Sequence, residues 1–203
     1  TTGIKNTLIG GRAGDALTDA DFNVAIGESA LSADTLGSRS VAIGTAALAD
    51  QNFTTATDSY NTAVGAFAGT AVTTGTHNTL IGGLAGDATT TGTGNTAIGQ
   101  EAFGVNTTGS DNVAIGRDAL DANTTASDNT AVGKSSLGGN TTGASNVAVG
   151  RSALLSNTTA SDNTAVGYQS LYANTTGTSN TAVGRKALTT NTTGSSNTAV
   201  GLN

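Results

Sequence analysis

Few residues in this chain have the type and spacing that catalysis or metal binding requires. The only histidine, His77, has no second histidine and no cysteine beside which it could bind a metal, and a lone imidazole is a poor candidate for a metal ligand or a general base. Asp111, Asp128 and Asp162 recur at wide, regular intervals along the chain, whereas acid–base catalysis needs two carboxyl groups side by side. We therefore expect no enzyme activity, no catalytic residue, no cofactor and no metal.

Motifs for cations, phosphates and nucleic acids are also missing. The segments 10–15 (GGRAGD) and 82–87 (GGLAGD) do not match the calcium-binding nonapeptide of β-rolls, and no G-x-x-x-x-G-K-[ST] loop occurs. Residues 1–111 carry 10 acidic and 3 basic groups, and residues 112–203 carry 4 and 5. This acidic balance disfavours nucleic acid as a partner. An isolated calcium ion on the acidic N-terminal half stays open as an alternative.

The elements that must carry these residues are the copies of one sequence repeat. Copies begin at Asn6, Asn23, Ser40, Asn61, Asn78, Asn95, Asn112, Asn129, Asn146, Asn163, Asn180 and Asn197, and every spacing is 17 except that from Ser40 to Asn61, which is 21. A short period that recurs this faithfully predicts a solenoid, in which each unit buries its apolar face against its neighbours. Residues 1–203 are therefore expected to form a single repeat array. The chain has no cysteine and no apolar run long enough to insert into a membrane.

Each position of the repeat, counted from the leading Asn as position 1, has its own expected role. Position 4 is Val or Ile in all twelve copies, position 2 is Thr or Val, and position 3 is Ala in ten and Leu in two. This β-branched pattern with a period of two predicts a short strand. Position 5 is always Gly, which favours a turn through positive φ. We therefore predict an all-β fold, a parallel β-solenoid of about twelve coils.

The other positions predict the rest of the cross-section. Positions 6 and 7 are mostly polar and indicate an exposed corner, whereas position 8 is Ala or Ser and position 9 is Leu or Phe in eight copies, which indicates a second wall of the core. Positions 12–17, Asn-Thr-Thr-Gly-x-Ser/Asp, are typical of a return turn. The Asn at position 1 would stack on its counterparts as an amide ladder. Six Asn-Thr-Thr sequences also match the N-glycosylation pattern, but the same residues are explained more simply by the turn.

Because alternate residues of a strand face opposite sides, one of its two faces must be the core. We expect positions 2 and 4 to point inward. The Ala at position 3 would then form a smooth outer stripe that lines an oligomer axis, most simply a threefold one. The reverse arrangement, with Ala inside and positions 2 and 4 outside, is the alternative, since Thr is a poor core residue.

Two departures from the repeat affect the core and the surface. Where position 9 is Gly, we expect a neighbouring apolar residue to fill the core instead: Leu17 for Gly14, Phe67 and Val72 for Gly69, and Leu84 for Gly86. The four extra residues fall within residues 51–60, in a return turn where a loop can bulge. Phe53 and Tyr60 in this bulge are the first candidates for contact with a ligand.

The motif N-T/V-A-V/I-G-x-x-A/S-L resembles the head repeat of trimeric autotransporter adhesins. The copies most similar to it are Asn23–Gly27 and Asn112–Gly116, and the resemblance covers residues 6–201. It also extends to repeats of phage tail-fibre and related surface-fibre proteins. It implies a left-handed, trimeric, parallel β-roll with Val and Ile inside and the Ala side toward the axis. The repeat here is longer than that of the adhesin heads because of its Asn-Thr-Thr-Gly turn.

These observations favour a structural or adhesive segment of an extracellular fibre, on a cell surface or a virion, without catalytic activity. Its expected partners are further copies of itself, as a homotrimer, and a host or surface glycan or protein. The alternatives are a phage tail-fibre shaft for host attachment and an ice-binding β-solenoid. Against ice binding, the adjacent threonines at positions 13 and 14 would face opposite ways on a strand, and the Thr file at position 2 is interrupted by Val.

Overall fold

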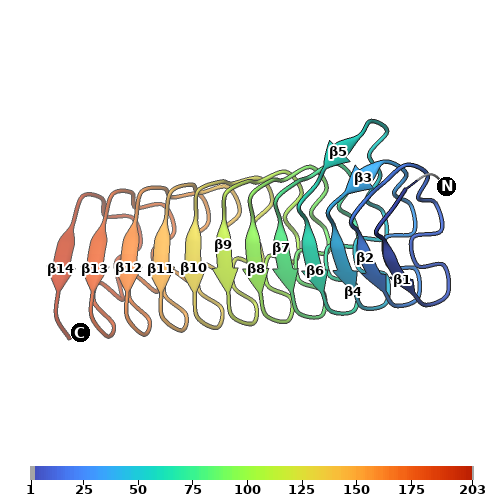
Figure 1. Ribbon diagram of the computed structural model, residues 1–203. Coiled ribbons are helices and arrows are strands. Elements are labelled where there is room, and N and C mark those ends of the chain that lie inside the picture. Colours follow the sequence, from blue (N-terminus) through green and yellow to red (C-terminus); the bar gives the residue numbers. More distant parts are fainter. Residues whose placement is uncertain (1–2, 203) are drawn as a thin grey trace.

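The computed structural model describes residues 3–202 as one long stack of coils (Figure 1). Its strands are β1 (Thr7–Ile9), β2 (Val24–Ile26), β3 (Gly37–Ser38), β4 (Val41–Ile43), β5 (Thr57–Asp58), β6 (Thr62–Val64), β7 (Thr79–Ile81), β8 (Thr96–Ile98), β9 (Val113–Ile115), β10 (Thr130–Val132), β11 (Val147–Val149), β12 (Thr164–Val166), β13 (Thr181–Val183) and β14 (Thr198–Val200). The described part contains no helix, and so none that could cross a membrane.

Twelve of these strands form one parallel sheet along the length of the stack. Their order is β1-β2-β4-β6-β7-β8-β9-β10-β11-β12-β13-β14, and each pairs with the next in the register of the repeat, as in Thr130↔Val147 and Val132↔Val149. The register follows from the period, because each copy of the repeat returns the chain to the same point one strand further on. The prediction of an all-β parallel β-solenoid is confirmed.

The predicted orientation of the strand was wrong. In the twelve-stranded sheet, from β2 to β13, the side chain at position 3 is completely buried, as in Ala25, Ala114 and Ala165, whereas positions 2 and 4 are half-buried or exposed. The Ala row therefore lines the core and cannot be an outer stripe that lines an oligomer axis. The alternative arrangement, with Ala inside and the β-branched files outside, is the one that the chain adopts.

The narrow cross-section explains this orientation. Position 9 on the opposite wall supplies one large, fully buried side chain in most coils, such as Phe103, Leu120 or Leu137. The residue that faces it must be small, because protein interiors have no room for a second large group in so thin a section. Position 1 adds a second constraint: its Asn is buried as well, and positions 1 and 3 lie on the same side of a strand.

The second wall is built from turns rather than from a strand. Non-glycine residues at positions 7 and 9 have positive φ, for example 57° at Asp118 and 51° at Leu120. This left-handed conformation costs an L-residue about 1–2 kcal/mol, so the burial of Leu at position 9 must offset it. Polar residues at position 6, such as Arg117 and Lys134, are exposed, which confirms this part of the predicted corner, whereas most residues at position 7, such as Asp118, are half-buried.

Two Asn ladders fill the polar half of the interior. At position 1, the Asn129 N–H donates to Asn112 Oδ1 at 3.0 Å, and Asn129 Oδ1 accepts from the Asn146 N–H at 3.0 Å. At position 12, Asn140 Nδ2 donates to Asn123 Oδ1 at 3.3 Å. Asn129 and Asn140 also both donate to the carbonyl of Gly143, at 3.0 and 2.9 Å. The predicted ladder at position 1 is confirmed, and it ties each strand to its own return turn.

The Gly at position 5 ends each strand in a conformation that few other residues adopt. Gly116 has a φ of 130°, and a Cβ built on it would lie 2.7 Å from the carbonyl carbon of Gly133 in the next coil. Both the positive φ and the close approach of the neighbouring backbone therefore require glycine, as predicted.

Core filling around the glycines at position 9 differs in part from the prediction. Leu17 and Val72 are buried as expected, but Phe67 is 45% exposed and Leu84 is half-buried. The missing volume near Gly69 and Gly86 is supplied instead by the Leu that replaces Ala at position 3. A Cβ on either glycine would lie within 2.6–2.7 Å of a methyl group of Leu80.

Candidate functional site

The first surface that could contact a partner is the outer face of the twelve-stranded sheet. It presents two parallel files, Thr or Val at position 2 and Val or Ile at position 4, in register over all twelve strands. Every position 4 side chain is half-buried or exposed; Ile81 in β7 is 37% exposed, and Val183 in the second-last strand, β13, is 36% exposed. The face is therefore a long, regular and partly apolar surface. Neighbouring strands are about 4.8 Å apart.

The second surface is a column at position 17, on the edge where the return turn meets the sheet. Five consecutive coils place cations and aromatic rings in alternation there: Lys5, Phe22, Arg39, Tyr60 and His77. Lys5 Nζ and the Arg39 guanidinium each lie 4.7 Å from the centre of the Phe22 ring. Arg39 also lies 5.9 Å from the Tyr60 ring, and the Tyr60 and His77 rings are 5.4 Å apart. We call these five residues the cation–aromatic column.

The cation–aromatic column is exposed although its residues are poorly suited to its conformation. Phe22 and Tyr60 are 40% and 51% exposed, and all five side chains sit on backbones with φ of 50–62°. Aromatic residues rarely adopt positive φ, whereas later coils place Gly94, Asp111 or Asp128 at the same position, types that tolerate it better. This departure from the repeat is confined to the N-terminal coils and borders the only large insertion.

The insertion forms a small bulge beside this column. Strand β5 of the bulge pairs in parallel with β3 of the preceding coil. Asp58 in β5 forms an ion pair with Arg39, with 3.1 Å between Nε and Oδ2, and accepts a long hydrogen bond of 3.4 Å from the Tyr60 hydroxyl. The bulge thus fixes two members of the column and neutralises one of its cations.

The two aromatic residues proposed from the sequence have different environments. Tyr60 is exposed, but Phe53 is only 6% exposed and packs under the bulge. Asp34, itself fully buried, holds this loop: its carboxylate accepts from the backbone N–H groups of Gly37 and Phe53, both at 3.0 Å, and from Gln51 Nε2 at 2.6 Å. Phe53 therefore supports the bulge, and only Tyr60 is available to a partner.

Sequence reasoning missed the partners of Tyr60. Phe22 and Arg39 belong to earlier copies of the repeat and His77 to the next position 17 along the chain, and only the repeat register brings them together. The signal was present, since all share position 17. His77 itself lies against Tyr60 and not in a cluster of metal ligands. Within residues 3–202, no group of three or more His, Cys, Asp or Glu side chains could hold a metal ion.

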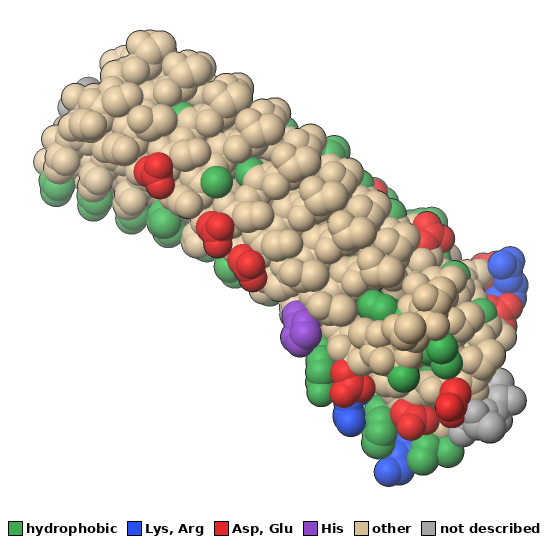
Figure 2. All heavy atoms as spheres, turned by 90° about the horizontal axis from the view of Figure 1, so that it is seen from above, with side chains coloured by type: hydrophobic (Ala, Val, Ile, Leu, Met, Phe, Trp, Pro, Cys, Tyr) green, Lys and Arg blue, Asp and Glu red, His purple; other side chains and the backbone are tan. Residues whose placement is uncertain are grey.

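Acidic residues gather at two other places. Asp111, Asp128 and Asp162 continue position 17 along the stack, and Figure 2 shows acidic side chains in line with the histidine along one border of the turn face. On the position 7–10 side, burial raises the pKa of Asp121, and the nearby charges of Asp118, Glu101 and Asp87 raise it further.

Asp87 belongs to the same group as Asp121. Burial also raises its pKa, with a further contribution from Glu101, against hydrogen bonds from the backbone. The two carboxylates flank Gly104, because a Cβ on this residue would lie 3.0 Å from Asp121 Oδ1 and 3.6 Å from Asp87 Oδ1. The mutual repulsion of these carboxylates is a local cost to the fold.

The remaining sequence motifs have structural or surface positions in the fold. In the segment 10–15, Asp15 lies 3.9 Å from Arg12 Nε, on the surface. Five of the six Asn residues of the Asn-Thr-Thr sequences, such as Asn106 and Asn157, are fully buried in the ladder at position 12, and Asn191 is half-buried. The five buried asparagines are therefore structural and are not accessible for modification in the folded chain.

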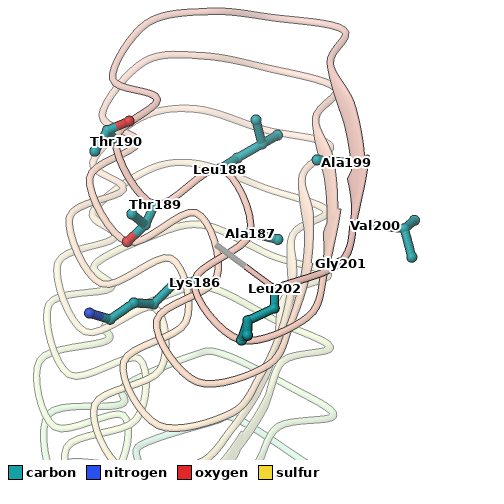
Figure 3. A pocket seen from close by; sticks show the side chains of 9 residues that line it. All are labelled: Lys186, Ala187, Leu188, Thr189, Thr190, Ala199, Val200, Gly201 and Leu202. Atoms are coloured by element: carbon teal, nitrogen blue, oxygen red, sulfur yellow. The ribbon is translucent and has the colours of Figure 1, made fainter.

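A hollow lies at the C-terminal end of the stack (Figure 3). It has a volume of about 510 Å³ and is lined by residues 186–190 and 199–202. Leu188 and Ala199 occupy core positions of the last coils that the structure describes, so this hollow belongs to the core of the stack.

No protein-family model matches this chain, and no curated protein or solved structure matches it either.

Proposed function

We propose that this chain is a structural and adhesive segment of an extracellular fibre, carried on a cell surface or a virion, and that it assembles as a homotrimer through the outer face of its sheet. The observation that supports this most is the unbroken Val/Ile file at position 4, which leaves apolar side chains on a flat surface over twelve strands. Extended apolar surfaces on soluble proteins mark sites of association. A rigid rod with such a face suits a fibre.

The role proposed for the sheet face differs from the one expected from the sequence. The Ala row is inside the core, so the threefold contact is assigned to positions 2 and 4. Methyl groups of Val, Ile and Thr from neighbouring copies would pack there, and the hydroxyl of Thr at position 2 tolerates both water and a protein surface. The corner and the return turn would remain outside, where a partner can reach them.

The oligomeric state in solution tests this proposal. Light scattering coupled to size exclusion should give three times the chain mass of 19.6 kDa. The double variant Ile115→Lys, Val132→Lys places two cations on the sheet face and should yield monomers, whereas Thr45→Lys, at an exposed position 6, should leave the trimer intact. A wild-type chain that is monomeric at micromolar concentration would refute assembly through this face.

For the adhesive role, the proposal assigns contact with a host or surface glycan to the cation–aromatic column. Exposed rings offer apolar faces to the C–H groups of sugars, and Lys5, Arg39 and His77 can donate hydrogen bonds to hydroxyl or carboxylate groups. Tyr60→Ala should then abolish binding on a glycan array. The matched control is Tyr168→Ala, because Tyr168 is also exposed and stacked on an arginine, Arg185, at 5.7 Å. Equal binding by both variants would discard this site.

A surface adhesin and a phage tail-fibre shaft share this fibre role. Immunogold labelling with antibodies against the chain, on producing cells and on phage particles, would tell the two apart.

A further inference from the structure

The most regular surface of the molecule is a double file of threonine on the return turns. In eight consecutive coils, positions 13 and 14 are both Thr; the pairs are 73–74, 90–91, 107–108, 124–125, 141–142, 158–159, 175–176 and 192–193. Every one of these side chains is exposed or half-buried, and every one at position 14 is exposed. The files begin directly after the insertion and continue to the last return turn.

The structure removes the objection that adjacent threonines must face opposite sides. Positions 13 and 14 lie in a bend rather than in a strand, so the alternation of a strand does not apply, and the side chains at both positions reach the solvent. The position 13 hydroxyl donates along the stack to the carbonyl of the next coil, as in Thr107 to Thr124 at 3.1 Å and Thr141 to Thr158 at 2.9 Å. Its methyl group is thereby held in one orientation.

The hydroxyls at position 14 make no hydrogen bond within the described part of the chain. None of the eight, from Thr74 to Thr193, donates to or accepts from another group of residues 3–202. Thr108, Thr125 and Thr142 therefore present a hydroxyl and a methyl group to solvent at each coil. Parallel stacking repeats this pair of groups about every 4.8 Å.

The surface under these threonines is rigid. Asn106 at position 12 donates from Nδ2 to the carbonyl of Gly109 at 3.2 Å and accepts from the Gly109 N–H at 3.1 Å, which closes the turn around the two threonines. Asn123 in the next coil donates to Asn106 Oδ1 at 3.0 Å. The Asn Nδ2 to carbonyl bond recurs in the six coils from Asn106 to Asn191, so the threonines of these coils keep one geometry from coil to coil.

The same face carries little charge. Figure 2 shows it as mostly uncharged, with acidic side chains along one border and mixed charges at the N-terminal end. Asp111, Asp128 and Asp162 are the charged groups at position 17 that flank the threonine files. A charged ligand would find few partners on the files themselves, whereas water would find hydroxyls and methyl groups in a fixed array.

We propose that the threonine files bind ice. Hydroxyl groups that hold water at a constant interval, between methyl groups that shape the water around them, can match the repeat of oxygen positions in the ice lattice. The interval along the stack is close to that repeat, and the array is long enough to hold many waters at once. This inference uses the return turns and not the sheet face, so it does not depend on the proposed trimer.

Thermal hysteresis of the full chain is the test. The wild-type solution at submillimolar to millimolar concentration should freeze below its melting point and should shape ice crystals into facets. Thr125→Tyr and Thr142→Tyr, in the middle of the files, should each lose at least half of the hysteresis, whereas Thr45→Tyr on the exposed corner should retain it. Circular dichroism of each variant checks that the solenoid still forms.

Two conservative variants at Thr125 distinguish a loss of ice binding from a change in the fold. Thr125→Val keeps the shape and the fold but removes the hydroxyl, and Thr125→Ser keeps the hydroxyl but removes the methyl group; both should reduce hysteresis. Absence of hysteresis and of ice shaping in the wild type, or full activity in Thr142→Tyr, would overturn the proposal. Either result would leave the oligomeric state, and thus the fibre proposal, unaffected.

Discussion

Leu80 occupies the space that Gly86 leaves in the core. A Cβ built on Gly86 would lie 2.7 Å from one Leu80 methyl group, and a Cβ on Gly69 would lie 2.6 Å from the other. Position 3 and position 9 thus share one volume across the thin section. The usual coils combine Ala at position 3 with Leu at position 9, whereas the coil that begins at Asn78 combines Leu80 with Gly86. Gly69, in the preceding coil, borders the same leucine. Val72, which is fully buried, fills further space next to Gly69, so the core stays packed as close packing requires.

This relationship predicts that replacing Leu80 and Gly86 together costs less stability than replacing Leu80 alone. Leu80→Ala should lower the free energy of unfolding by about 3 kcal/mol, because it opens a cavity that rigid neighbours cannot close. Adding Gly86→Leu should recover at least half of this loss, since Leu is accommodated at the same φ in other coils. Urea denaturation measures both. Leu84→Ala, at a half-buried site, is the control and should cost less than about 1 kcal/mol; additive effects of Leu80→Ala and Gly86→Leu would contradict the shared volume.

The Asn ladder should be as important to stability as the apolar core. Asn129→Ala removes an acceptor for the Asn146 N–H and a donor to the Gly143 carbonyl, both buried. Leaving such groups without partners should cost about 2–4 kcal/mol. Asn52→Ala, at an exposed position in the bulge, should change the thermal midpoint very little. Equal midpoints for the two variants would show that the ladder contributes nothing.

Left-handed residues at position 17 are places where glycine should stabilise the chain. Ser145 has a φ of 57° and an exposed side chain, so Ser145→Gly should relieve strain and raise the free energy of unfolding by up to about 1 kcal/mol. Ser156→Gly is the contrast, because its backbone has negative φ and glycine there only adds freedom to the unfolded chain. A chemical denaturation series should therefore give shifts of opposite sign.

The acidic group near Gly104 should make stability depend on pH. The folded-state pKa values of Asp87 and Asp121 are raised, so folding favours their protonated forms. Their stabilising contribution to the free energy of unfolding is fully present below the ordinary aspartate pKa of about 3.9 and is lost as the pH rises through the raised pKa values of the folded state. Asp121→Asn should thus raise the thermal midpoint at pH 7 and have no such advantage at pH 3.

The matched control for this pH effect is Asp50→Asn, which removes an exposed carboxylate elsewhere on the chain. A gain from Asp121→Asn that was the same at pH 3 and pH 7 would contradict an electrostatic origin.

The parts of the fold that could be predicted from the sequence are those whose residues recur with the period of the repeat. The solenoid, the glycine turn after each strand and the Leu wall all follow from features that recur in nearly every coil. The face of the strand that points into the core could not be predicted in this way, because Ala and Val are both acceptable core residues when each is considered alone. The decisive observation was the Asn at position 1: a ladder of amides needs protection from water, so position 1 is inside, and position 3 must then be inside too.

The candidate sites were harder to foresee because they depend on side chains in neighbouring coils. Phe53 and Tyr60 were chosen as aromatic residues in a loop, but burial of Phe53 depends on the Asp34 carboxylate, which anchors the loop from the preceding coil. Predicting the cation–aromatic column would have required aligning the residues at position 17 of successive coils by the register of the repeat. The threonine pair was misjudged because a strand geometry was assumed where the chain bends.

The burial of the ladder at position 12 also bears on how this protein can be made. Asn106, Asn123, Asn140, Asn157, Asn174 and Asn191 each begin an Asn-Thr-Thr sequence and each hold a return turn closed from inside. A eukaryotic secretory pathway attaches glycans to such sequences while the chain is still unfolded, and a glycosylated asparagine has no place in a core this thin. Production in a bacterial cytoplasm avoids this conflict, whereas secretion from yeast or animal cells would yield chains whose coils cannot close.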